Sequence, residues 1–187
     1  AQQYANKQFA LLNYELEITD EFRDDLAPAK DFYNSVEVHN KEVEDRLKAI
    51  MVHHLYYTMK RRLEKNLEIS ILPINTFLDD FNYNPFGYPK GHIGKAIRKA
   101  DFPYYYKIKI ILDSQTDKMK EEDPSLQGDI VFPEYQIKLT VFSDEGIMPV
   151  NKWEGSYMHD KPLDAGKALF KGWVDQEELN LQNAYEG

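Results

Sequence analysis

The sequence predicts an α+β fold, in which an antiparallel or mixed sheet of about four to five strands carries one long helix and a C-terminal helix packed on it. Apolar residues that recur at helical spacing over 40–65 indicate the long helix. Short segments in which apolar and polar residues alternate indicate strands with one face in water. The 187 residues, 42% of them hydrophobic, suffice for one core. We therefore expect 1–187 to form a single domain.

The first elements are a strand and a helix. Residues 12–19 alternate between apolar and polar and predict a half-buried strand, and the charged segment 20–34 predicts a loop or short helix. Asn40 is a suitable N-cap for the long helix, and Asn66 can close it in a left-handed conformation. The apolar stripe of this helix is formed by Val43, Leu47, Ile50, Met51, Leu55, Met59 and Leu63.

The middle of the chain continues with strands and a short helix. Residues 67–74 predict a strand with Pro73 near its end, where a missing N–H is tolerated. A short helix is expected over 92–100. Residues 104–112 then alternate clearly and predict a second strand.

The remaining elements complete the sheet and add a helix. The polar, acidic segment 113–129 predicts an irregular connection. Residues 135–141 alternate as a third strand, and a turn at 143–146 joins it to a strand over 150–157, forming a hairpin. Pro162 can begin the C-terminal helix.

Composition excludes several classes of partner and chemistry. The net charge of -9 disfavours nucleic acid and anionic lipid, both of which bind clustered Lys and Arg. The chain has no cysteine, which excludes disulfides and cysteine metal sites. No apolar run reaches the length of about 18 residues that a membrane span needs, so no span is expected.

No motif predicts catalysis, a metal or a cofactor. The adjacent His53 and His54 point about 100° apart on a helix, whereas a zinc helix needs histidines four residues apart. The oxygen-rich run 113–117 lacks the glycine of a calcium loop. The segment 155–157 lacks the glycine spacing of a nucleophile elbow. We expect no catalytic residue, no metal site and no cofactor, and a binding role is favoured over an enzymatic one.

The segment 77–89, here called the aromatic loop, combines five aromatic residues with Asn, Pro and Gly. We expect it to be irregular and on the surface, where loops carry function. Aromatic rings beside Asn and Asp suit protein contacts and carbohydrate platforms alike. The alternative is that the loop folds back and caps the core. The candidate binding residues are Asp79, Asp80, Phe81, Tyr83, Phe86 and Tyr88.

Two features indicate export. The strand ending at 71–74, the helix ending at 96–100 and the strand 104–112 together resemble a unit of the α/β domains of curli-secretion and Tol-type lipoproteins. This resemblance implies a role in assembly at the bacterial cell envelope. The start Ala1-Gln2-Gln3 is typical of a chain from which a signal peptide has been removed. We expect the protein in the periplasm or outside the cell.

Two functions are compatible with these observations. The first is a non-enzymatic, exported binding or assembly module that contacts another envelope protein or a second copy of itself. The alternative is a carbohydrate or small-ligand binding protein that uses the aromatic loop. This alternative predicts a concave pocket in which Tyr83, Tyr88 or Trp153 lies beside Asp or Asn side chains.

Overall fold

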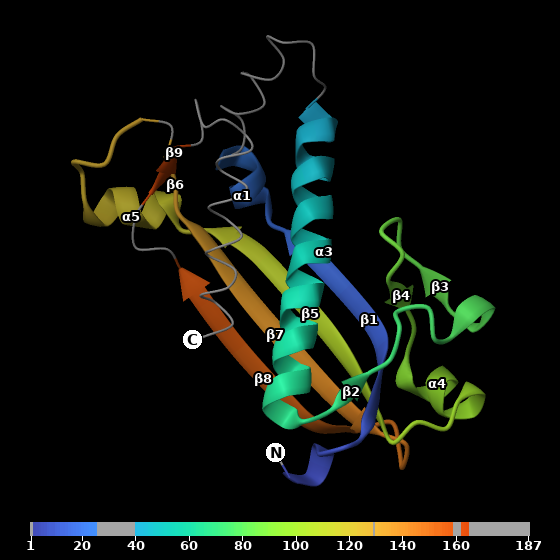
Figure 1. Cartoon of the computed structure of the whole chain (residues 1–187). Helices are drawn as coiled ribbons and strands as arrows, with labels where there is room; N and C mark the ends of the chain where they lie inside the picture. The colour runs from blue at the N-terminus through green and yellow to red at the C-terminus, as the bar shows by residue number, and fades with distance from the viewer. Residues whose placement is uncertain (1, 26–39, 129, 159–161, 165–187) are drawn as a thin grey trace. The chain divides into compact units, whose positions relative to one another are not determined.

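The structure, a computed structural model, describes residues 2–25, 40–128, 130–158 and 162–164. It is α+β, and its main sheet is mixed, with seven strands in the order β3-β4-β1-β5-β7-β8 and β2 paired to β1 (Figure 1). Backbone contacts group the chain into two compact units. The first comprises Ala1–Glu15, Tyr56–Lys109 and Ile137–Glu154, and the second comprises Leu16–Leu55, Ile110–Gln136 and Gly155–Gly187.

The sheet has more strands than the four to five predicted from the sequence. The long strands overlap four of the predicted segments and are β1 (Gln8–Ile18), β5 (Tyr104–Ser114), β7 (Pro133–Ser143) and β8 (Pro149–Met158). The additional strands have two residues each and are β2 (Ser70–Ile71), β3 (Asn82–Tyr83) and β4 (Pro89–Lys90). A strand of two residues is too short to show an alternation of apolar and polar side chains. The sequence prediction therefore missed β3 and β4 and made β2 too long.

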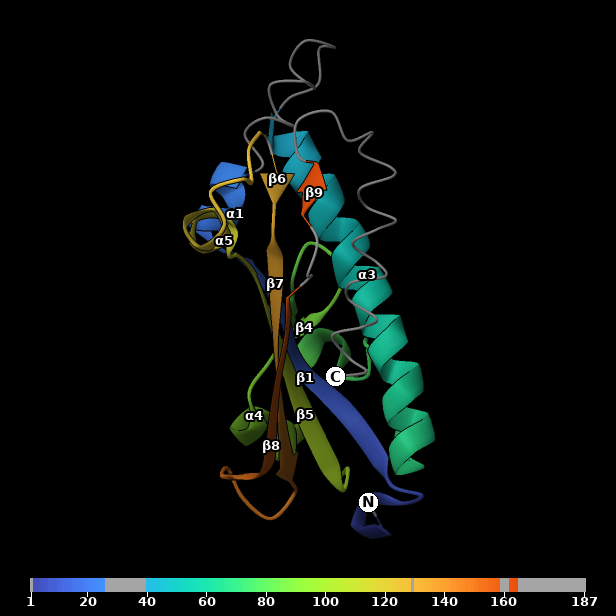
Figure 2. The same cartoon turned by 90° about the vertical axis from the view of Figure 1, so that its left-hand side faces the viewer.

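Within the first unit, the sheet buries side chains on both faces. Phe9 and Tyr106 lie on the face covered by residues 56–67 of helix α3 (Asn40–Leu67). Leu12 and Tyr105 are buried on the other face, beside helix α4 (Ile93–Lys99). Figure 2, which views the sheet edge-on, shows α4 and the part of α3 that belongs to the first unit on opposite sides. The first unit therefore requires two apolar layers, one against each helix.

The end of α3 is fixed by the strand that follows it. The helix continues to Leu67, and Glu68, with φ of 54°, takes the left-handed conformation that the sequence assigned to Asn66. The carbonyl of Glu68 accepts from Asn6 N (2.8 Å), and Glu64 Oε1 accepts from Ile71 N (3.0 Å). These bonds turn the chain so that β2 pairs parallel with the start of β1.

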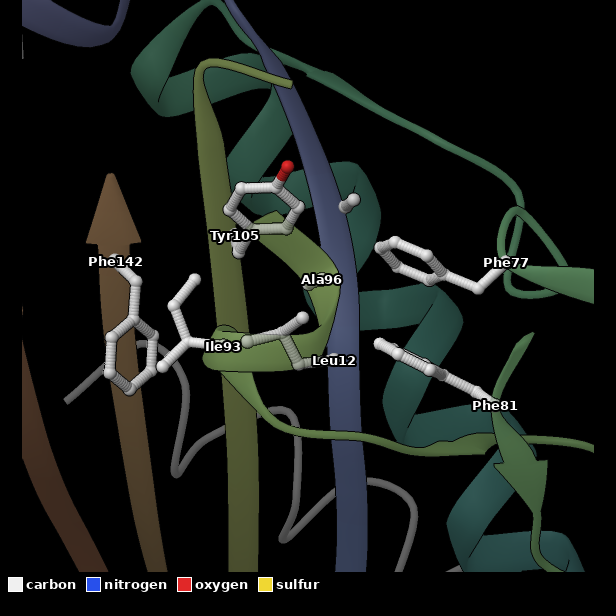
Figure 3. Close-up of a cluster of buried hydrophobic side chains, with 8 residues drawn as sticks. Leu12, Phe77, Phe81, Ile93, Ala96, Tyr105 and Phe142 are labelled. Atoms are coloured by element: carbon white, nitrogen blue, oxygen red, sulfur yellow. The ribbon is translucent and has the colours of Figure 1, made fainter. Parts of the chain in front are cut away.

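A buried cluster holds α4 against the sheet (Figure 3). Ile93 and Ala96 of α4 pack with Leu12 and Tyr105, and Phe77 and Phe81 of the aromatic loop close the cluster. The helix begins at His92, whose Nδ1 accepts from Lys95 N (3.3 Å).

Gly91 joins β4 to this cluster at close range. Its N–H donates to the carbonyl of Leu12 (2.7 Å), and a Cβ at Gly91 would overlap the ring of Phe81. Glycine at this position therefore lets Phe81 enter the core.

The second unit departs from the sequence prediction in two places. The segment 113–129, expected to be irregular, contains helix α5, because Thr116 Oγ1 donates to Asp25 Oδ2 (2.8 Å) and accepts from Phe132 N (3.0 Å) at the start of the helix. Residues 163–164, expected in a helix, form a strand, and the rest of the predicted C-terminal helix lies outside the described residues. The elements of this unit include α1 (Asp20–Asp25), α5 (Thr116–Glu122), β6 (Ile130–Val131) and β9 (Leu163–Asp164), of which β6 and β9 pair antiparallel.

The substitution Gly91→Ala tests how tightly the loop is packed. Overpacking of a filled core costs about 1–3 kcal/mol, so urea denaturation of Gly91→Ala should show a loss of unfolding free energy in that range. The control is Gly146→Ala, because an added Cβ there meets no atom within 4 Å. Equal stability of the two variants would contradict the packing of Phe81 against Gly91.

Candidate functional site

The aromatic loop folds onto the core and buries three of its five rings, those of Phe77, Phe81 and Tyr88. Phe77 and Phe81 stack with ring centroids 4.2 Å apart, and both are buried against α4 and Tyr105 (Figure 3). Phe81 is one of the predicted binding residues, and its ring is not available at the surface. Each buried phenylalanine contributes about 2–3 kcal/mol of transfer free energy, so this arrangement is favoured over an exposed loop.

The polar residues of the loop build a turn, which corrects the expectation that they prevent regular structure. Asn84 Oδ1 accepts from the N–H groups of Phe86 (2.9 Å) and Tyr88 (3.1 Å), and Asn84 N donates to the carbonyl of Tyr88 (2.8 Å). Gly87 supplies the positive φ of 89° that closes the turn. The result is the hairpin of β3 and β4, in which Tyr83 pairs with Pro89.

Tyr88 lies in a cluster of buried tyrosines. Its ring meets Tyr14 (4.7 Å) and Tyr56 (5.1 Å) edge-on, and the hydroxyls of Tyr56 and Tyr106 lie 3.3 Å apart in hydrogen-bond contact. Burial raises the pKa of Tyr56 to about 12 and raises the pKa values of Tyr88 and Tyr106 above the usual value for tyrosine. These hydroxyls therefore stay neutral in the folded protein.

The other predicted binding residues remain at least partly accessible. Asp79 is exposed, and Asp80 is half-buried and pairs with Lys99 Nζ at 3.4 Å. Tyr83 and Phe86 are half-buried, and the pKa of Tyr83 is raised by burial and by the two aspartates. The structure thus brings Asp79, Asp80 and Tyr83 together, but a binding role for them stays a prediction.

The pocket expected for a small ligand does not form around Trp153. A cavity between the C-terminal half of α3 and the sheet has Trp153 in its wall, but its volume is about 10 Å³ and its lining is apolar. Neither Tyr83 nor Tyr88 contributes to this wall. Such a volume holds about one water molecule, which is far less than a sugar requires.

Neither a cluster of metal-binding side chains nor a membrane-spanning helix is found in the described part of the chain. His53 is exposed, and nothing is described of the His54 side chain. Among the described residues, no three His, Cys, Asp or Glu side chains group closely enough to hold a metal ion. Of the helices described, none combines the length and the apolar content needed to cross a membrane.

The largest exposed apolar side chains of the first unit lie mostly on and before strand β8. Met148 is 76% exposed, Ile147 66%, Val150 49% and Trp153 39%. In the path of hydrogen-bonded strands, β8 is the last strand beside β7, so its outer edge is unpaired among the described residues (Figure 1). We call residues 147–154 the β8 edge.

The β8 edge is held in place by the N-terminal segment. Trp153 meets the ring of Tyr4 edge-on at 6.3 Å, and Asn151 Nδ2 donates to the Tyr4 hydroxyl (3.2 Å). Tyr4 ends the 3₁₀ helix η1 (Gln2–Tyr4), and its own ring is buried against Phe9. Contacts with Tyr4 on this side therefore limit the orientation of the Trp153 indole.

The sequence contains a signal for this edge that pattern reading did not use. Ile147, Met148 and Val150 follow directly on the predicted turn 143–146, where polar residues are usual. Apolar residues at a hairpin end are either buried by the rest of the chain or available to a partner. The choice depends on the order of strands, which local patterns do not reveal.

Comparisons with known proteins show a distant likeness in structure. No family model matches the chain, and no curated protein matches it. The lipoprotein GNA1162 from Neisseria meningitidis is similar with a TM-score of 0.47 and 8% identity, over 95% of this chain and 99% of that one. The hypothetical protein CT253 from Chlamydia trachomatis is similar with a TM-score of 0.40 and 10% identity, over 95% of this chain and 98% of that one.

The buried tyrosines predict a loss of stability in alkali. The unfolded state releases the Tyr56 proton near pH 10, whereas the folded state retains it up to about pH 12. The contribution of Tyr56 to the free energy of unfolding should therefore be constant below pH 10 and fall between pH 10 and 12, by at most about 3 kcal/mol. Urea denaturation at several pH values should show a shallower fall for Tyr56→Phe. The control is Tyr57→Phe at the neighbouring exposed ring, and an equal change of slope in both variants would refute this assignment.

Proposed function

We propose that this chain is a non-enzymatic binding module of an assembly at the bacterial cell envelope, and that it contacts its protein partner through the β8 edge. The observation that carries this proposal is the coincidence of an unpaired strand edge with exposed apolar side chains at Ile147, Met148, Val150 and Trp153.

The physical argument is that both features favour association. An unpaired edge offers main-chain N–H and C=O groups to another strand. Exposed apolar side chains lose unfavourable contact with water when a partner covers them. Because Trp153 is already held by Tyr4, little side-chain freedom is lost on binding.

Charge and location narrow the type of partner. The net charge of -9 supports a protein partner over nucleic acid. The cell envelope is supported by the local resemblance of residues 71–112 to envelope lipoprotein domains.

Site-specific photo-cross-linking tests this surface. A photoreactive amino acid placed at Met148 in cells that produce the protein should yield protein adducts on illumination. The same amino acid placed at Lys118, which is exposed on α5, should yield few or none. Both variants should first be shown to melt like the parent protein. Absence of adducts at 148, or equal adduct yields at both positions, would sink the proposed role of the β8 edge.

A further inference from the structure

We infer that the partner of the β8 edge is a second copy of this chain, paired antiparallel, β8 to β8, about a two-fold axis that passes at Trp153. The inference rests on the proposed role of this edge and adds the identity and the register of the partner.

Two-fold pairing of identical edge strands is geometrically simple. Antiparallel strands related by a two-fold axis present the same surface to each other, so any favourable contact occurs twice. The main-chain ladder of the sheet then continues from β7 through β8 into the second copy. Such pairing needs complementary side chains in one register, and the sequence of β8 contains them.

The charges of β8 select a single register. Lys152 and Glu154 are exposed and lie on the same face of the strand, on either side of Trp153. When the axis passes at Trp153, Lys152 of each copy lies opposite Glu154 of the other. Shifting the axis to Lys152 or to Glu154 places identical charges opposite each other, which is destabilising. The pattern thus favours one register and penalises its neighbours.

The same residues explain why this edge does not pair freely with other strands. A lysine on an exposed edge discourages pairing because its charge must be desolvated or matched. Here Glu154 of a second copy provides the match. The arrangement therefore admits a copy of itself and disfavours strands without the complementary charges.

Trp153 lies on the opposite face of the strand, and its backbone lies at the two-fold axis. There each indole is held edge-on by its own Tyr4 at 6.3 Å and lines the small cavity under α3 with Leu139 and Val141. Val150 lies on the charged face, where it faces Ser156 of the other copy.

A charge-swap experiment tests the pairing. Sedimentation equilibrium of the purified chain, at about 0.15 M salt to screen the repulsion of the two acidic copies, should show a concentration-dependent dimer. Lys152→Glu and Glu154→Lys should each weaken it by about tenfold, since each places two pairs of like charges face to face. The double variant, with both substitutions, should restore the parental dissociation constant, because the opposite charges face each other again.

A disulfide test reads the register directly. The natural sequence has no cysteine, so Trp153→Cys introduces a single thiol. At the axis, the two thiols face each other at a separation that suits a disulfide, and mild oxidation should give a covalent dimer. Lys152→Cys is the matched control, because in this register its thiol faces Glu154 of the other copy and should cross-link far more slowly.

The outcomes separate this inference from the proposed function. A parent chain that stays monomeric, or a dimer that ignores both charge reversals, overturns self-pairing. If the probe at Met148 then captures a different protein, the β8 edge keeps its role and only the identity of its partner changes. An adduct of the probe with residues 165–187 of the same chain overturns both, because the edge would be covered internally.

Discussion

The constraint on which the rest of the first unit depends is that its sheet is buried on both faces. Phe9 and Tyr106 need cover from α3, and Leu12 and Tyr105 need cover on the opposite side. The helix α4 is too short to provide that second layer alone, so the aromatic loop supplies Phe77 and Phe81. The need for a second layer explains the composition of this segment. Its rings fill the layer, Asn84 and Gly87 reverse the chain, and Gly91, just after the loop, admits Phe81.

This constraint also explains where the sequence was informative. Apolar and polar residues alternate in the part of β1 after Tyr14, in 104–112 and in 135–141. In each of these segments the polar side chains are at least partly exposed, so the sequence shows the period of a strand. The part of β1 that is buried on both faces, 9–12, is a continuous apolar run without period. Its strand character is decided by pairing with β2 and β5, which are distant in sequence.

The candidate site was predictable only in part, for the same reason. Asn, Gly and aromatic residues over 77–89 correctly marked an unusual segment, but the same composition serves an exposed platform and a folded-back cap. The choice between these two arrangements depends on the space beside Ala96 and Gly91, into which the Phe81 ring packs. Helix α4 forms part of the wall of this space. Likewise, α5 depends on Asp25, which lies far from Thr116 in sequence. Neither contact can be predicted from the secondary-structure propensity of the local sequence.

The outer edge of β8, unlike the aromatic loop, is not covered by other described parts of the chain. The rings of Phe77, Phe81 and Tyr88 are used inside the first unit, so they contribute no surface for binding. Strand β8 has no such cover on its outer edge in the described chain, and Val150 on it and Ile147 and Met148 just before it remain exposed. Whether a strand becomes an edge is a property of strand order, to which the whole chain contributes. The aromatic residues of 77–89 therefore belong mainly to the core of this protein. The candidate contact surface is instead indicated by the position of β8 at the end of the sheet and by the charges of Lys152 and Glu154 on it.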